Sequence, residues 1–276
     1  MIIVSSKNLL AEYIQDYKRN KKKITVIPTM GNLHLGHLEL MKRAPKNTIK
    51  IVTIYINKLQ FDNLNDFMNY PKTYNLDIDK CKELDIDLLF IPDKNFSKDI
   101  KEYKNINLPK FTNYLCGEFR KEHFTGVYSI VRYLFNLIKP DYACFGLKDF
   151  QQLLLIKFIR DTYFKDLKII EVETKRDKRG IALSSRLNRL SNDEILNIEK
   201  IYSCLNQIKL NIKNNISFHD IKPVAIKELE SSSIKVEYLE HRSNDTLEIC
   251  NDCCLDSSIF IACIINKVRL IDNIQI

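Results

Sequence analysis

The sequence predicts an α/β protein in which a doubly wound parallel sheet is followed by a smaller α+β domain. Short apolar runs alternate with amphipathic segments through the first two-thirds of the 276 residues, as in a parallel sheet covered by helices. After about residue 185 the pattern changes to two amphipathic helices and then three strands. We therefore expect a larger Rossmann-like domain over 1–180 and a smaller α+β domain over 181–276.

The expected elements follow from β-branched or aromatic runs, which predict strands, and from helical spacing of apolar positions. The strands of the larger domain are expected at 24–27, 51–56, 87–91, 142–145 and 167–172, and its helices at 36–43, 73–84, 126–138 and 149–163. The smaller domain should contain helices at 193–210 and 219–229, then strands at 236–239, 259–265 and 268–272. Ligands of such a sheet gather at the carboxyl ends of its parallel strands.

Composition and charge narrow the classes of partner. The 43 basic and 35 acidic residues give a net charge of +8, which suits a phosphate-bearing ligand, nucleic acid or an anionic membrane surface. The densest basic run, Lys18 to Lys23, lies between an amphipathic segment and an apolar strand, where cations favour a helix C-terminus. No basic stripe interleaved with aromatic residues is present, so nucleic acid is not an expected partner.

The chain also lacks membrane and export signals. No stretch approaches about 20 apolar residues, and the first five residues lack the basic start and cleavage site of a signal peptide. We therefore expect no membrane partner and a cytoplasmic location.

A cysteine run near the C-terminus offers one alternative function. Cys250, Cys253 and Cys254, with Cys263 or His241 as a fourth ligand, could in principle bind zinc. The second half of the usual paired spacing is missing, so we predict no metal-binding residues here.

The segment after the strand at 24–27 has the pattern of an anion site. It reads Pro-Thr-Met-Gly-Asn-Leu-His-Leu-Gly-His from Pro28 to His37. A strand, a glycine turn and a helix N-terminus direct free backbone N–H groups and the helix dipole at a ligand. His34 and His37, with the small Gly36 between them, could donate hydrogen bonds to a departing pyrophosphate.

Two further segments suit phosphate. Phe145 to Gln152, Phe-Gly-Leu-Lys-Asp-Phe-Gln-Gln, again follows a strand and opens a helix, which brings Lys148 to a phosphate position. Ser184, Ser185 and Arg186 supply two hydroxyls and a guanidinium in succession. Three separate segments of this kind indicate a nucleotide ligand.

The order and spacing of these motifs resemble the pantothenate synthetase family. Three further segments share the resemblance, which covers essentially the whole chain: Tyr55 to Phe61, Tyr70 to Thr73 and Arg269 to Asn273. The resemblance implies an ATP-dependent ligase that joins pantoate to β-alanine through a pantoyl adenylate. It also implies Mg²⁺ bound with the nucleotide, and a homodimer. Broader HxGH nucleotidyltransferases share only the first motif and a loose counterpart of the Ser-Ser-Arg segment.

Carried over by matching positions, the resemblance assigns site residues. His37, in the role of proton donor, His34 and Lys148 would act in catalysis. Gln60 and Gln152 would hold pantoate, and Gln60 would also meet β-alanine. The ATP site would comprise Met30, Gly31, Asn32, Leu33, His34, Leu35, Gly36, His37, Gly146, Leu147, Lys148, Asp149, Lys175, Leu183, Ser184, Ser185 and Arg186.

The sequence departs from the family pattern in three places. Lys58 stands where proline is usual, Leu147 where an acidic residue is usual, and Arg120 to Phe124 reads Arg-Lys-Glu-His-Phe instead of Arg-Pro-Gly-His-Phe. Losing proline and glycine should change the conformational preferences of that loop. Arg120 and His123 could be surface residues or site residues, and Asn57 could cap a strand end or touch substrate.

Two rival functions remain open at this point. Another HxGH adenylyltransferase would leave Gln60 and Gln152 without an explanation. A basic nucleic-acid-binding protein on a degenerate nucleotide fold would show damaged phosphate motifs, whereas these motifs are intact.

Overall fold

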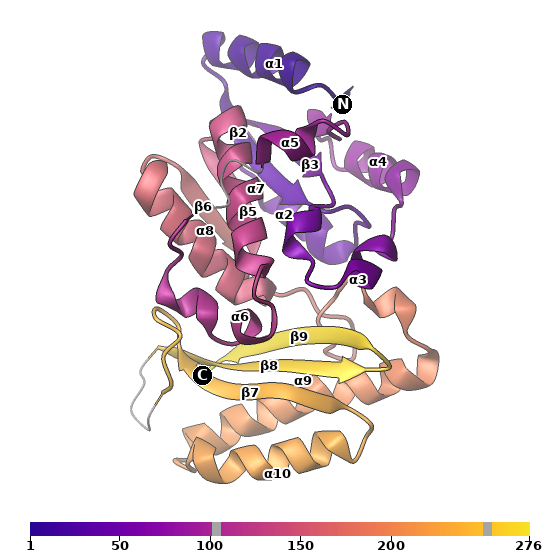
Figure 1. Cartoon of the computed structure of the whole chain (residues 1–276), viewed down its shortest axis with the longest axis vertical. Helices are drawn as coiled ribbons and strands as arrows, with labels where there is room; N and C mark the ends of the chain where they lie inside the picture. The colour runs from indigo at the N-terminus through magenta and orange to yellow at the C-terminus, as the bar shows by residue number, and fades with distance from the viewer. Residues whose placement is uncertain (101–105, 251–255) are drawn as a thin grey trace.

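A six-stranded parallel sheet forms the larger part of the molecule, in the order β1-β4-β3-β2-β5-β6. The computed structural model describes residues 1–100, 106–250 and 256–276, and Figure 1 shows their arrangement. The strands are β1 (Ile2–Val4), β2 (Lys23–Thr29), β3 (Thr48–Ile54), β4 (Leu88–Phe90), β5 (Tyr142–Gly146) and β6 (Lys168–Val172).

Helices connect and cover these strands. They are α1 (Lys7–Arg19), α2 (Leu35–Arg43), α3 (Leu64–Met68), α4 (Tyr74–Glu83), α5 (Phe96–Ile100), α6 (Cys116–Phe119), α7 (His123–Ile138) and α8 (Phe150–Tyr163). Short 3-10 turns lie at Lys58–Gln60, Lys110–Asn113, Leu147–Asp149 and Leu187–Arg189.

Alternate residues of the central strands pack on opposite faces of the sheet. Val26 and Ile51 belong to the core that includes residues of α1, α5, α7 and α8, whereas Ile27 and Val52 belong to the core under α2 and α4. Both faces are therefore buried, which is why neighbouring positions such as Val26 and Ile27, or Ile51 and Val52, are both apolar. The predicted doubly wound fold is confirmed.

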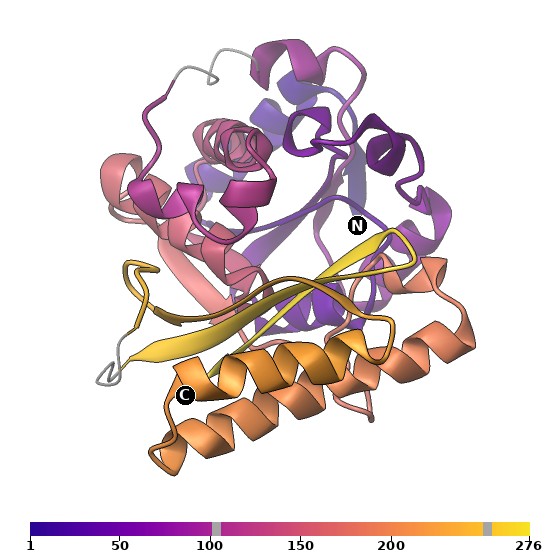
Figure 2. The same ribbon diagram turned by 60° about the horizontal axis from the view of Figure 1, so that its bottom comes forward.

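The C-terminal part is a second layered unit. Its elements are α9 (Asn192–Lys213), α10 (Phe218–Glu230) and the antiparallel strands β7 (Lys235–Ser243), β8 (Ser257–Ile265) and β9 (Val268–Gln275). One face of this sheet, including Ile259 and Ile261, packs on the two helices (Figure 2). The other face brings Phe260 against Phe150 of α8, with ring centroids 5.4 Å apart. The sheet is thus sandwiched between its own helices and the larger domain.

The expected elements all occur, but some bounds shift by up to four residues, as for β3, which begins at Thr48 instead of 51, and β7, which ends at Ser243 instead of 239. The sequence reading missed β1, a three-residue strand whose Ile2 and Ile3 are exposed, because so short a run gives almost no periodic signal. It also missed α3, α5 and α6, each of four or five residues. Helix α7 begins at His123, three residues earlier than expected.

Two other expectations can be located in the fold. The basic run lies at the end of α1, where Lys21 to Lys23 are exposed. The proposed boundary at 180/181 falls between β6 and α9, and Ile181 packs in the C-terminal core. Within the described ranges, no helix is both long and apolar enough to cross a bilayer.

Candidate active site

A cavity of about 800 Å³ lies between the two domains, beyond the carboxyl ends of β2 and β5. The chain leaves β2 toward β3 on one side and β5 toward β6 on the other, so this is the point where ligands bind in open α/β sheets. The predicted residues that line the cavity are Met30, His34, Gly36, His37, Gln60, Gly146, Lys148, Asp149, Gln152, Lys175, Leu183, Ser184, Ser185 and Arg186.

Two backbone N–H groups of the glycine turn after β2 already donate hydrogen bonds to a carboxylate. The N–H groups of Asn32 and Leu33 donate to the two Asp77 oxygens, at 2.9 and 2.8 Å. Gly31, with φ +79°, makes the bend that brings these N–H groups together. The backbone donors expected to be free for phosphate are therefore occupied at these two positions. Gly31, Asn32, Leu33 and two other predicted ATP-site residues, Leu35 and Leu147, are not part of the cavity lining.

His34 and His37 cap the start of α2. The N–H of Gly36 donates to His34 Nδ1 at 3.1 Å, and the N–H of His34 donates to His37 Nδ1 at 3.2 Å. Both Nδ1 atoms accept, so each neutral ring carries its proton on Nε2. The ring centroids are 4.1 Å apart.

Burial keeps both rings neutral. Burial, and next the charge of Lys148, lower the pKa of His34 to about 4. Burial, and next the neighbouring His34, lower the pKa of His37 well below its usual range. Two neutral rings protonated on Nε2 can donate hydrogen bonds from these atoms to phosphate oxygens.

The C-terminal domain holds the backbone of the Lys148 turn. Asn273 Nδ2, in β9, donates to the carbonyl oxygens of Leu147 and Lys148 at 3.1 and 2.9 Å. The Lys148 ammonium makes no ion pair or hydrogen bond within the described residues, and the residue lines the cavity. Its charge is therefore available to an anion.

The Ser184 to Arg186 turn is docked on the loop after β2. Ser185 Oγ donates to the carbonyl of Asn32 at 3.2 Å, and Asn32 Nδ2 donates to the carbonyl of Ser185 at 3.2 Å. The Arg186 guanidinium pairs with Asp66 of α3 at 2.9 Å. Asp66 also pairs with Arg189 at 2.6 Å, so this carboxylate ties the interdomain segment to the larger domain.

The two adjacent glutamines of α8 have different surroundings. Gln151 also borders the cavity, but it is buried, accepts from the N–H of Cys116 and donates to the carbonyls of Phe111 and Tyr114. Its role is structural. Gln152 lines the cavity and forms no side-chain hydrogen bond with another described residue, so its amide is free for a ligand.

Gln60 ends the 3-10 turn after β3. It is 8% exposed, and its amide contacts Met30 Sδ and Asn57 Nδ2 at 3.0 and 3.2 Å. Asn57 is 1% exposed and also donates to the carbonyl of Gly126. Of the two roles left open for Asn57, the structure supports the local one, because its amide secures the Gln60 turn against α7.

Arg120 and His123 are not free surface residues, because both line the cavity and contact the carbonyl of Gln60. Glu122 has φ −93°, and neither it nor Lys121 adopts a left-handed conformation. The position where the family has glycine therefore needs none here, and this departure introduces no backbone strain.

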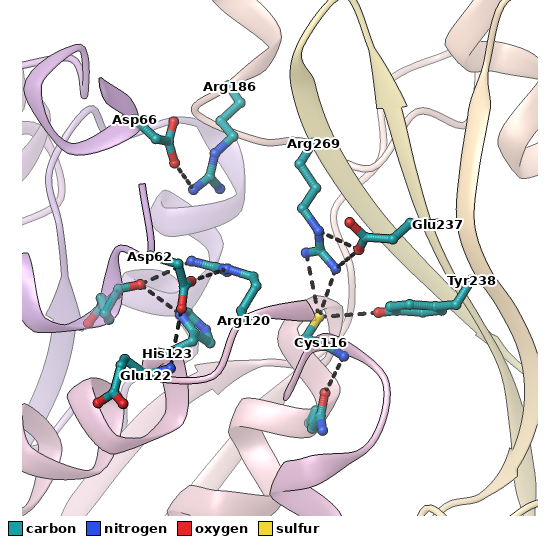
Figure 3. A network of polar contacts seen from close by, with 12 residues as sticks. Asp62, Asp66, Cys116, Arg120, Glu122, His123, Arg186, Glu237, Tyr238 and Arg269 are labelled. Carbon is teal, nitrogen blue, oxygen red and sulfur yellow. Dashed lines mark hydrogen bonds and ion pairs between the residues drawn. The ribbon is translucent and has the colours of Figure 1, made fainter. Parts of the chain in front are cut away.

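Sequence reasoning missed the acidic partners of the cavity arginines and a buried cluster at the domain interface. Arg269 of β9 pairs with Glu237 of β7 and lies 3.6 Å from Cys116 Sγ of α6. Tyr238 Oη is 3.2 Å from the same sulfur. Figure 3 shows these side chains beside the Asp62–Arg120 and Asp66–Arg186 pairs. Of the four cluster residues Arg269, Glu237, Cys116 and Tyr238, only Arg269 lies within a motif that sequence singled out.

The zinc alternative receives no support from the described residues. They contain no group of three or more His, Cys, Asp or Glu side chains placed to hold a metal ion. Cys253 and Cys254 lie outside the described residues, His241 hydrogen-bonds Ser257, and Cys263 is a buried free thiol in the C-terminal core.

Comparisons with known proteins agree on one family. The family model for pantoate-beta-alanine ligase matches residues 2–275. A pantothenate synthetase of Laribacter hongkongensis is 37% identical over 96% of this chain and 97% of the relative, and one of Wigglesworthia glossinidia brevipalpis is 39% identical over 100% and 99%.

Solved structures give the same answer. The pantothenate synthetase of Thermus thermophilus covers 99% of both chains at 28% identity with a TM-score of 0.88. The pantoate-beta-alanine ligase of Francisella tularensis, complexed with beta-gamma ATP and beta-alanine, covers 99% of this chain and 97% of its own at 33% identity with a TM-score of 0.84. The chain described here belongs to the pantoate-beta-alanine ligase family.

Proposed function

We propose that this chain joins pantoate to β-alanine in two steps, with ATP as the energy source. In the first step a pantoate carboxylate oxygen attacks the α-phosphorus of ATP, and pyrophosphate leaves. In the second step the amine of β-alanine attacks the acyl carbon of pantoyl adenylate, and AMP leaves. The amine loses its protons to solvent or to a nearby base, and no bond to the enzyme is needed.

One observation carries this proposal. A single cavity contains two kinds of polar group: Lys148, His34 and His37, which suit phosphate, and the neutral amides of Gln60 and Gln152, which suit a small hydroxy acid. Neutral amides can bind hydroxyl and carboxylate groups without adding a charge that must be desolvated. An adenylyltransferase for a nucleotide acceptor would have no use for the second set.

In the first step the protein positions the reactants and stabilises charge. The Nε2–H groups of His34 and His37 and the Lys148 ammonium would donate to phosphate oxygens, on which negative charge increases as pyrophosphate departs. The Ser184 and Ser185 hydroxyls border the same cavity and would contact the nucleotide. Arg186 would do so only by giving up part of its pair with Asp66.

In the second step Gln60 would face the incoming β-alanine as well as pantoate. Its side chain lies beside Met30, at the end of β2, and Gln152 approaches the cavity from the start of α8. The two amides therefore come from different elements, and the acid would bind between them.

Mg²⁺ would accompany the nucleotide. The carboxylates of Asp149 and Asp66 border the cavity, but the described residues contain no cluster of three such ligands. The donor set therefore fits an ion bound mainly through phosphate oxygens and water, where it would offset phosphate charge. The family resemblance further favours a homodimer in the cytoplasm, and sedimentation of the purified chain would test the dimer.

The test uses purified protein with ATP, Mg²⁺, pantoate and β-alanine, with each omitted in turn. Pyrophosphate release should require pantoate and ATP, and AMP release at a sustained rate should also require β-alanine. Gln60→Ala and Gln152→Ala should each raise KM for pantoate about three-fold to a hundred-fold, and KM for ATP much less. Gln207→Ala, an exposed amide on α9, is the control and should leave both constants unchanged.

The kinetic pattern separates the alternatives. If both variants lost ATP affinity and kept pantoate affinity, the glutamines would belong to the nucleotide site, and the broader adenylyltransferase function would be favoured. Gln60→Ala should also slow the reaction of preformed pantoyl adenylate with β-alanine, which a single-turnover assay measures directly.

A further inference from the structure

We propose that Asp62, Arg120 and His123 form a clasp that positions Gln60 for the acid substrates without contacting those substrates. The inference rests on the proposed role of Gln60 in binding pantoate. The three residues come from two segments about 60 positions apart in the sequence, and Figure 3 shows them side by side. All three border the cavity.

Two donors converge on one backbone oxygen. Arg120 Nη2 donates to the carbonyl of Gln60 at 3.0 Å, and His123 Nδ1 lies 2.9 Å from the same oxygen. A carbonyl oxygen can only accept, so Nδ1 of His123 must carry the proton. With both lone pairs engaged, this carbonyl is held at the start of α7.

Asp62 completes the clasp from the Gln60 side. It lies two residues after Gln60, and its Oδ2 accepts from Arg120 Nε at 3.0 Å. Its Oδ1 accepts from the N–H of Glu122 at 3.2 Å, one residue before α7 begins. The Arg120 side chain is 17% exposed and that of Asp62 is 29% exposed, a partly buried setting in which such a pair is screened less than one on the surface.

The other side of the Gln60 turn rests on α7 itself. Asn57 links Gln60 Oε1 to the carbonyl of Gly126, and a Cβ on Gly126 would lie 2.5 Å from Gln60 N. The turn is therefore held between α7 and the clasp, and its side-chain amide reaches Met30 at the edge of the cavity. If the clasp is released, the turn can rotate, which moves the amide away from the acid site.

The charge pattern supports a positioning role for Arg120. Burial lowers the pKa of Arg120, and Arg186 and Arg269 lower it further. Asp62 is the carboxylate that offsets this effect at close range. Because Arg120 already donates to Asp62 and Gln60 through Nε and Nη2, two of its three guanidinium nitrogens are committed to holding the turn.

The experiment measures whether these residues act through Gln60. Asp62→Asn and His123→Leu are expected to lower kcat/KM for pantoate about ten-fold to a hundred-fold, because misplacement by about 1 Å has effects of this size. KM for ATP should change less than about three-fold in the same variants. His123→Asn, which can keep a donor near the Nδ1 position, should restore much of the loss. Asp79→Asn removes the same charge from the exposed Asp79–Lys82 pair and should have no effect.

A double-mutant cycle supplies the readout that a merely structural role would not give. In the Gln60→Ala background, Asp62→Asn and His123→Leu should lower kcat/KM for pantoate by less than about three-fold further, since the group they position is gone. Hydrogen exchange of peptides covering 57–62 should be faster in Asp62→Asn, while urea denaturation keeps a single cooperative transition.

The outcomes distinguish this inference from the function on which it rests. An equal loss in both backgrounds would mean that the clasp residues act on substrate directly, and would overturn the proposal. Unchanged kinetics in Asp62→Asn together with an impaired Gln60→Ala would overturn the clasp alone. Unchanged pantoate kinetics in Gln60→Ala would overturn the proposed role of Gln60, and with it the reason for the clasp.

Discussion

Replacing Gly126 by alanine tests how closely the substrate turn depends on α7. Gly126 lies on the first turn of α7, and a Cβ placed on it would lie 2.5 Å from Leu59 C, Leu59 O and Gln60 N. These are backbone atoms, so no side-chain rotation can relieve the clash. The Leu59–Gln60 turn has to move by about 1 Å to reach ordinary contact distance.

The magnitudes predict a small loss of stability and a large loss of activity. Overpacking costs about 1–3 kcal/mol, but alanine is favoured over glycine within a helix by up to about 1 kcal/mol. The net loss in the free energy of unfolding should be about 0–2 kcal/mol. A displacement of about 1 Å in a substrate-binding group can reduce kcat/KM about a hundred-fold.

The assay combines urea denaturation with steady-state kinetics in which pantoate and ATP are varied separately. The control is Thr125→Ala, a neighbour on α7 that is outside the cavity lining, and it should change neither constant by more than about two-fold. We expect Gly126→Ala to lose pantoate efficiency while ATP affinity is largely retained. A Gly126→Ala enzyme with wild-type pantoate kinetics would refute the reasoning, because it would show that the Gln60 turn can shift without consequence.

Three further predictions concern pH, stability and surface charge. Because His34 has a pKa of about 4 in the folded chain and about 6.5 when unfolded, the unfolded chain binds more protons between these values. The free energy of unfolding should therefore fall as the pH drops from about 6.5 toward 4, and His34→Asn should flatten this slope in urea titrations. Arg176 forms a two-bond ion pair with the nearly buried Asp272, so Arg176→Met should lower the free energy of unfolding by about 3–5 kcal/mol, measured by denaturation. Replacing the exposed lysines Lys21 to Lys23 with glutamine should leave kcat/KM unchanged at moderate salt, and a salt-sensitive loss would contradict their assignment as a solvated helix end.

The features that sequence predicted are those with a repeating or local signal. Ile24 to Ile27 and Ile51 to Val52 could be assigned to strands because the burial of both sheet faces places apolar or β-branched residues at adjacent positions. His34, His37 and Lys148 could be assigned to a site because each follows a strand and opens a helix or turn. In these cases residues close by in the sequence are enough to predict the element or the site.

The features that sequence missed depend on distant partners. Asp77 lies on α4, 45 positions after Asn32, and nothing near it indicates that it satisfies the turn after β2. Asp62 and Asp66 look like ordinary polar residues of an exposed segment until α7 and the interdomain turn bring Arg120 and Arg186 to them. An acidic residue has no periodic pattern that reveals which cation it will meet.

The carboxylates that border the cavity influence which side chains contact the nucleotide first, because they already pair with its arginines. Arg120, Arg186 and Arg269 are paired with Asp62, Asp66 and Glu237 respectively. A triphosphate that recruited one of these arginines would have to weaken an existing charge-assisted pair, which offsets part of the gain. Lys148 has no such partner among the described residues, and the neutral rings of His34 and His37 can donate without breaking an ion pair. The initial phosphate contacts should therefore come from these three side chains, with Arg186 joining only if the phosphate competes successfully with Asp66.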